Sequence, residues 1–136
     1  MMIIDAENAR LGRLASFVAK KLLQGEKIEI INAEKTIITG NPDSTVEKYL
    51  RLRRKGSPQH GPFFPRRPDL IVRRTIRGML PYKKPKGRNA YKNLKVHIGV
   101  PDGLEGEIVK FAEKQKPIRC RYITIFELAK RIGWNG

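Results

Sequence analysis

Residues 2–33, MIIDAENARLGRLASFVAKKLLQGEKIEIINA, decide the fold of this chain. Residues 2–6 and 27–33 each indicate a short strand, because they are rich in β-branched residues and end at polar positions. Between them, apolar residues recur with the spacing of one helix face: Leu11, Leu14, Ala15, Val18, Ala19 and Leu22. We expect Asn8 to cap this helix and Gly25 to end it. The stretch therefore predicts a βαβ unit with two parallel strands and a right-handed connection.

The segment after this unit indicates a short extended piece and a second helix. Residues 36–39 are extended and closed by Gly40. Pro42 and Asp43 open the helix, which turns an apolar face inward. That face consists of Val46, Tyr49 and Leu50.

The C-terminal third contains weaker signals and one clear helix. Residues 94–98 alternate as in a half-exposed strand, 108–116 indicate a helix, and 118–122 indicate an extended stretch. Thr124 and Glu127 form a capping box ahead of an apolar stripe, which predicts a final helix. This stripe consists of Ile125, Leu128, Ala129 and Ile132. Gly133 ends the helix, and Trp134 is expected to pack back on the core.

Alternating strands and helices around a few short strands predict a three-layer α/β/α domain with a small, mostly parallel sheet. The length of 136 residues and the 40% apolar content are sufficient for a real core, and we expect one domain over residues 1–136. We expect the βαβ unit to begin this domain and a basic segment rich in proline and glycine to leave it as an excursion.

That basic segment, residues 51–92, carries most of the net charge. It contains 14 of the 29 lysines and arginines and one acidic residue, Asp69, and thus +13 of the total +16. A surface that serves solubility alone mixes both signs of charge, so this segment indicates a polyanionic partner. Ten phosphate contacts would give a log–log salt slope of roughly −7 to −9.

Within this segment, Pro68 opens a helix with two faces. Val72, Ile76 and Met79 form the apolar face, whereas a ridge of arginines, Arg73, Arg74 and Arg77, forms the other. Pro81 is expected to end the helix. We expect residues 56–65 to be a loop, and Pro85 and Gly87 to keep residues 82–89 irregular. Aromatic residues lie between the cations: Phe63, Phe64, Tyr82 and Tyr91.

The arrangement of these cations favours RNA over DNA. Proteins that read DNA usually present a regular helix or ribbon to the major groove, whereas here most cations lie on broken loops beside aromatic rings. Such loops suit the unpaired bases and crowded phosphates of folded RNA. A DNA- or RNA-associated protein outside any large assembly, such as a chromosomal protein, is the alternative.

Other classes of function have weaker support. No apolar run approaches the ~20 residues of a membrane span, and no secretory signal is visible, so we expect a cytosolic protein without a membrane partner. His60 and His97 lack the spacing of metal ligands, and Cys120 is expected to be a small buried hydrophobe, not a nucleophile. The loop after the first strand lacks both glycine-rich phosphate-binding motifs. We therefore expect no catalytic residue, no metal, no cofactor and no small-molecule substrate. An enzyme for a phosphorylated ligand, using the βαβ crevice, is the remaining alternative.

Three stretches of the chain resemble one known family. DAENARLGRLASFVAKKLLQG with IEIINAEKTIITG, the central GPFFPRRPDLIVRRTIRGMLPYKKPKGRNAYKNLKVHIGVP, and the ending FELAKRIGW are similar to the universal L thirteen family of large-ribosomal-subunit proteins, in its archaeal form. The run RTIRGMLP is the most specific part. Ile76 stands where valine is usual, and Tyr82 stands where relatives often have His or Lys.

The resemblance implies a three-layer fold with a four-stranded sheet and a structural role on large-subunit rRNA. It implies neighbouring large-subunit ribosomal proteins as further partners, aid to subunit assembly, a cytoplasmic location in the large subunit, and neither catalysis nor a cofactor. The residues expected to contact rRNA are Arg51, Arg53, Arg54, Lys55, His60, Arg66, Arg67, Arg73, Arg74, Arg77, Lys83, Lys84, Lys86, Arg88 and Lys92. The three helical arginines form the ordered part of this set.

Overall fold

The N-terminal βαβ unit forms as its sequence predicts. The computed structural model describes residues 1–54 and 65–136. Strands β1 (Met2–Asp5) and β2 (Ile28–Ile31) pair in parallel, and α1 (Leu11–Leu23) connects them. All six residues of the predicted apolar stripe are buried. A buried stripe of this width fixes the rotation of the helix against the sheet.

The two ends of α1 differ from each other in how well they were predicted. Gly25 follows the helix with a positive φ of 91°, as expected for a C-terminal stop. The expectation that Asn8 caps the helix is wrong, because the N-cap is Arg10 and no side chain caps it. Asn8 has a φ of 61° and donates its backbone N–H to the Lys35 carbonyl. Asn8 therefore joins the turn before α1 to the segment around Lys35 and does not cap the helix.

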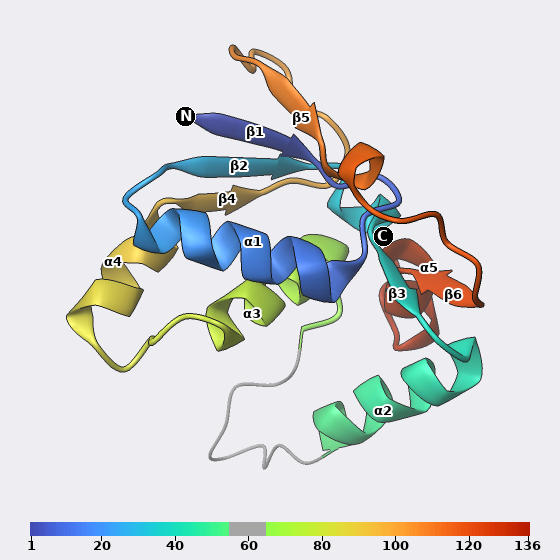
Figure 1. Ribbon diagram of the computed structural model, residues 1–136. Helices are drawn as coiled ribbons and strands as arrows, with labels where there is room; N and C mark the ends of the chain where they lie inside the picture. Colours follow the sequence, from blue (N-terminus) through green and yellow to red (C-terminus); the bar gives the residue numbers. More distant parts are fainter. Residues whose placement is uncertain (55–64) are drawn as a thin grey trace.

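The main sheet has four parallel strands in the order β4-β2-β1-β5 (Figure 1). Its outer strands are β4 (Leu94–Val96) and β5 (Ile108–Lys110). The α/β class and the parallel four-stranded sheet are confirmed. The helix expected over 108–116 is wrong, since β5 is followed by a 3-10 helix, η2 (Phe111–Lys114). Pairing of Ile108 and Val109 with β1 overrides the weak helical pattern.

The direction of the chain across the sheet decides what lies on each face. From β1 to β2 to β4 the chain moves one way, and then it crosses back to β5. Because parallel connections are right-handed, this return passes over the face opposite α1. Gly106, in that connection, carries no Cβ, and one added there would lie 3.3 Å from the Ile3 side chain. Successive residues of a strand point to opposite faces of the sheet, and Ile4 belongs to the core on the α1 face. Ile3 therefore points to the other face, where it is buried.

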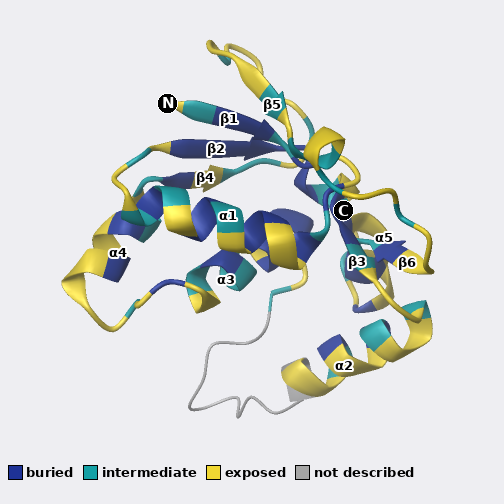
Figure 2. Ribbon diagram, viewed as in Figure 1, coloured by how far each residue is buried: buried dark blue, intermediate teal, exposed yellow. Residues whose placement is uncertain are grey.

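Helices α3 (Pro68–Gly78) and α4 (Pro85–Lys92) join α1 in one hydrophobic core with the sheet (Figures 1 and 2). Ile71, Val72 and Ile76 of α3 are fully buried. Met79 was expected on this apolar face, but it lies at the C-cap and is 44% exposed. Helix α3 thus ends at Gly78, before the predicted stop at Pro81.

Helix α4 corrects the expectation that residues 82–89 are irregular. Pro85 stands in its first turn, where the missing N–H costs nothing and the fixed φ favours the helix. Gly87 is buried against the preceding turn, and a Cβ there would lie 2.0 Å from the Pro81 carbonyl oxygen. Proline and glycine usually interrupt helices, but here they allow α4 to begin at Pro85 and to pack against the turn at Pro81.

A second, smaller group of elements lies at the carboxyl ends of the sheet strands. After β2 come η1 (Ala33–Lys35), β3 (Ile37–Thr39) and α2 (Pro42–Arg54). Strand β3 pairs antiparallel with β6 (Tyr122–Thr124), which leads into α5 (Ile125–Arg131). The Thr124 hydroxyl accepts the N–H of Glu127 at 3.2 Å, so the predicted cap of α5 is confirmed. Trp134 packs against the core as expected.

Candidate nucleic-acid interface

The arginines of α3 lie against aromatic rings. The guanidinium carbon of Arg77 lies 4.0 Å from the centre of the Tyr82 ring, and that of Arg73 lies 4.7 Å from the Tyr91 ring. The two rings meet edge to face, with centres 5.6 Å apart at 85°. We call Arg73, Arg77, Tyr82 and Tyr91 the cation–aromatic cluster. It joins α3, the turn after it, and α4.

This cluster changes the expected picture of an arginine ridge turned outward. Arg73 and Arg77 are only half-exposed, and the Nε atom of Arg73 is buried without a hydrogen-bond partner among the described residues. Cation–aromatic contacts of this kind stabilise a structure by about 0.5–2 kcal/mol, depending on how far they are desolvated. Both arginines therefore hold α4 against α3 and also present positive charge.

Five of the predicted cations are exposed on α4 and on the turn before it. They are Lys83, Lys84, Lys86, Arg88 and Lys92. Lys84 is the N-cap of α4, whose first turn contains no acidic residue. Positive side chains at the positive end of a helix are unfavourable by about 0.3–1 kcal/mol each at low ionic strength. A bound anion would relieve this repulsion, so the local electrostatics favour phosphate.

Two further arginines precede α3, and each lies close to another part of the protein. Arg67 donates to Asp69 at 2.9 Å, and this carboxylate is largely buried near the positive end of α3. Arg66 is exposed, and its side chain lies beside Gly133, within 3.5 Å of where a Cβ would stand there. The ion pair cancels part of the charge of Arg67, which makes this residue a weaker candidate for phosphate contact than the lysines of α4.

Helix α2 presents its cations from a different part of the fold. It contacts α5 and β6, whereas α4 contacts α1 (Figure 1). Arg51 is exposed on α2; Arg53 and Arg54 belong to its last turn, but their side chains lie outside the described part of the structure. Lys55 and His60 also lie outside the described residues. Of the predicted cations, those that the structure describes thus lie on α3, on α4 and on the segments that precede them, with Arg51 at a separate position on α2.

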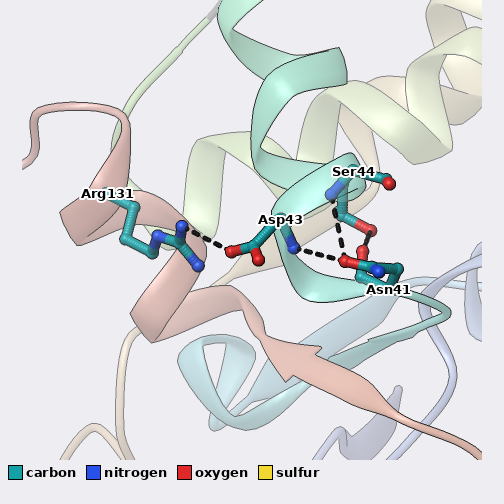
Figure 3. Close-up of polar contacts among 5 residues, drawn as sticks. Asn41, Asp43, Ser44 and Arg131 are labelled. Carbon is teal, nitrogen blue, oxygen red and sulfur yellow. Dashed lines mark hydrogen bonds and ion pairs between the residues drawn. The ribbon is translucent and has the colours of Figure 1, made fainter.

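The start of α2 is held in place by a cap and an ion pair (Figure 3). The Asn41 side-chain oxygen accepts the N–H groups of Asp43 and Ser44 at 2.9 and 3.3 Å. Arg131 of α5 donates to Asp43 at 2.9 Å. These contacts orient α2, and therefore Arg51, relative to the C-terminal helix.

Sequence reasoning missed the structural partners of the arginines. Tyr82 and Tyr91 were noted as aromatic residues among cations, but not as rings that organise those cations. One sequence signal could have indicated this contact: if residues 85–92 are read as a helix, Tyr91 lies on it and can meet an arginine of α3. Lys20 of α1 was missed as well, and it borders a cavity of about 690 Å³ together with Met79 and Lys86.

Other chemistry finds little support in the described residues. In these ranges, no group of three or more His, Cys, Asp or Glu side chains is arranged to hold a metal ion. Cys120 is exposed, so the expectation that it is a buried hydrophobe is wrong. None of the helices described is long and apolar enough to span a bilayer.

Comparison with known proteins gives consistent matches. The family model of ribosomal protein L13 matches residues 1–102. The large ribosomal subunit protein uL13 of Methanopyrus kandleri is 48% identical over 98% of this chain and 87% of its own length. The uL13 proteins of Methanocaldococcus jannaschii and Methanococcus maripaludis are 53% and 48% identical, each over 98% of both chains.

Proposed function

Because the chain belongs to the ribosomal protein L13 family, we propose that it is a structural constituent of the large ribosomal subunit. In this proposal it binds and stabilises large-subunit rRNA, aids assembly, and has no catalytic role. It works in the ribosomes of the cytoplasm, next to other large-subunit proteins. This role is supported by relatives that are named large ribosomal subunit proteins and align with 98% of this chain.

The observation that supports rRNA as the ligand is the charge of α3, α4 and the turn between them. Residues 66–92 contain ten lysines and arginines and one acidic residue, Asp69, which is paired with Arg67. The cations of α4 are exposed, with Lys84 and Lys86 at the positive end of that helix and Lys92 in its last turn. Each phosphate that they neutralise would release counterions and steepen the salt dependence of binding.

The exposed lysines provide the direct test. In a triple variant, Lys83→Gln, Lys84→Gln and Lys86→Gln, we expect weaker binding of a large-subunit rRNA fragment and an unchanged fold. The slope of log K against log salt should become shallower by roughly 0.7–0.9 for each lost phosphate contact. Arg73 and Arg77 are left intact because they support α4.

A matched control removes the same charge elsewhere. Lys110, Lys114 and Lys116 are exposed near β5 and η2, and their change to Gln should leave the slope unchanged. Equal effects of the two triple variants would contradict an interface on α4. Tighter binding to duplex DNA of the same length than to the rRNA fragment would contradict the proposed role.

A further inference from the structure

A cavity of about 650 Å³ opens where α3 ends and the chain turns towards α4. Its volume lies within the ~300–1,000 Å³ that is usual for sites of small organic ligands. Its lining combines an apolar part, Leu80, Pro81 and Tyr82, with four cations, Arg74, Arg77, Lys83 and Lys84. No residue that lines it is acidic. The cavity therefore suits a ligand with both a flat apolar surface and negative charge.

Arg77 gives this cavity a stacking platform. Its guanidinium carbon lies 4.0 Å from the centre of the Tyr82 ring, and the Tyr91 ring meets the Tyr82 ring edge to face. A guanidinium plane has two faces, and Tyr82 covers one of them. Planar guanidinium groups and aromatic rings are the surfaces on which proteins stack unpaired bases. The pair is held in position before any ligand arrives, which lowers the entropic cost of binding.

We propose that this cavity binds one unpaired nucleotide of the RNA, with its base stacked on Arg77 and its phosphate close to Lys83 and Lys84. The inference rests on the proposed function and deepens it, because it assigns one pocket to base stacking as distinct from phosphate contact. An inorganic anion would leave the apolar lining unused. A metal cation would be repelled by the lining charges.

The test separates base stacking from charge. The probes are two single-stranded RNA oligonucleotides of equal length, one with 2-aminopurine at its centre and the other with an abasic site there. Arg77→Lys keeps the charge and removes the planar group. We expect it to weaken binding of the base-bearing RNA about tenfold, within the range measured for the loss of one stacked base. Binding of the abasic RNA and the salt slope should stay unchanged.

A second variant fills the cavity without touching the stacked pair. Gly78 lines the cavity in the last turn of α3, and a Cβ added there meets no atom within 4 Å. We therefore expect Gly78→Leu to place its side chain in the cavity, exclude the base, and abolish the stacking-dependent change in 2-aminopurine fluorescence, with circular dichroism as the check on folding. Gly78→Ala adds only a methyl group to the lining, so it should reduce this fluorescence change less than Gly78→Leu does. These variants keep the inference testable if Arg77→Lys lowers stability.

Removal of charge gives the contrasting result. Lys84→Gln should weaken binding of both RNAs to the same extent and make the salt slope shallower. If Arg77→Lys and Gly78→Leu also weaken both RNAs equally, the base does not occupy this cavity. Displacement of the 2-aminopurine RNA by a polyglutamate peptide as readily as by the abasic RNA would indicate an anion site without base stacking. In both cases, salt-dependent binding of rRNA would leave the proposed function intact.

Discussion

The N-terminal βαβ unit and the α3–α4 segment are built on opposite principles. In the first, Ile4, Leu14, Val18 and Ile30 are fully buried, and apolar packing joins the helix to the two paired strands. In the second, Ile71, Val72 and Ile76 enter the same core, and contacts of two arginines with tyrosines add to this apolar packing. The contrast teaches that arginines of a strongly basic segment can take part in packing when aromatic rings lie against them.

Loss of core packing in the βαβ unit should have the largest effect. Leu14 of α1 is 0% exposed and belongs to the central core. Leu14→Ala should lower the free energy of unfolding by about 2–5 kcal/mol, because the cavity that it leaves can collapse only in part. Urea denaturation followed by circular dichroism measures this. Lys20→Ala, on the exposed side of α1, should change it by at most about 0.5 kcal/mol.

The α3–α4 segment should respond strongly to a single methyl group. In Gly87→Ala the new Cβ would lie 2.0 Å from the Pro81 carbonyl oxygen, so the backbone has to move. We expect a loss of about 1–3 kcal/mol in stability and release of α4 from the turn before it. Gly78→Ala is the matched control, since its Cβ meets open space and alanine favours a helix. Equal stability of the two variants would mean that α4 is not packed on Pro81.

Alkaline pH tests whether the contrast extends to α2, a cationic helix with a buried tyrosine. Burial raises the pKa of Tyr49 above its ordinary value of 10.0. The unfolded chain therefore loses the tyrosine proton at a lower pH than the folded chain. Stability should fall as the pH rises above about 10 and towards the raised pKa, by at most about 1.4 kcal/mol per pH unit from this group.

The variant Tyr49→Phe should make this decline shallower in urea titrations at pH 9 to 11. Phe111→Leu, which removes another ring but no proton, should leave the slope in place. An unchanged slope in Tyr49→Phe would show that other groups cause the alkaline loss.

The smallest effect is expected outside both regions, at the ion pair between α2 and α5. Asp43 and Arg131 are 2.9 Å apart, but their side chains are 78% and 40% exposed. Asp43→Asn should lower stability by about 0.2–1 kcal/mol, and high salt should reduce the difference. Thermal melts at two ionic strengths measure it. A loss above 2 kcal/mol would contradict this expectation, because the ion pair would then be a main contribution to the contact between α2 and α5.

The reliability of sequence patterns differed between the two regions for a physical reason. The stripe from Leu11 to Leu22 predicted a buried helix face correctly, because the 3.6-residue period and the burial report the same geometry. In residues 82–89, Pro85 and Gly87 predicted irregular structure. They instead form the first turn of a helix that must approach Pro81 closely, which is a requirement of tertiary packing.

The candidate interface was predictable in its charge and less so in its geometry. Composition located the cations, and the exposed lysines of α4 lie where phosphate can reach them. Arg73 and Arg77 are half-buried against rings that lie 18 and 5 residues away in sequence. No local pattern encodes which ring meets which guanidinium. The strand β5 was missed for a similar reason, since its pairing with β1 joins residues about 105 positions apart.

Sequence periodicity and composition were thus sufficient for the βαβ unit, the capped final helix and the position of the positive charge, because each depends on neighbours within a few residues. Contacts between distant segments determined the rest. The docking of α4, the strand β5, the cation–aromatic cluster and the cavity beside it each require partners that only the folded chain brings together. Their free energy comes from desolvation and close packing across elements, and local sequence does not contain it.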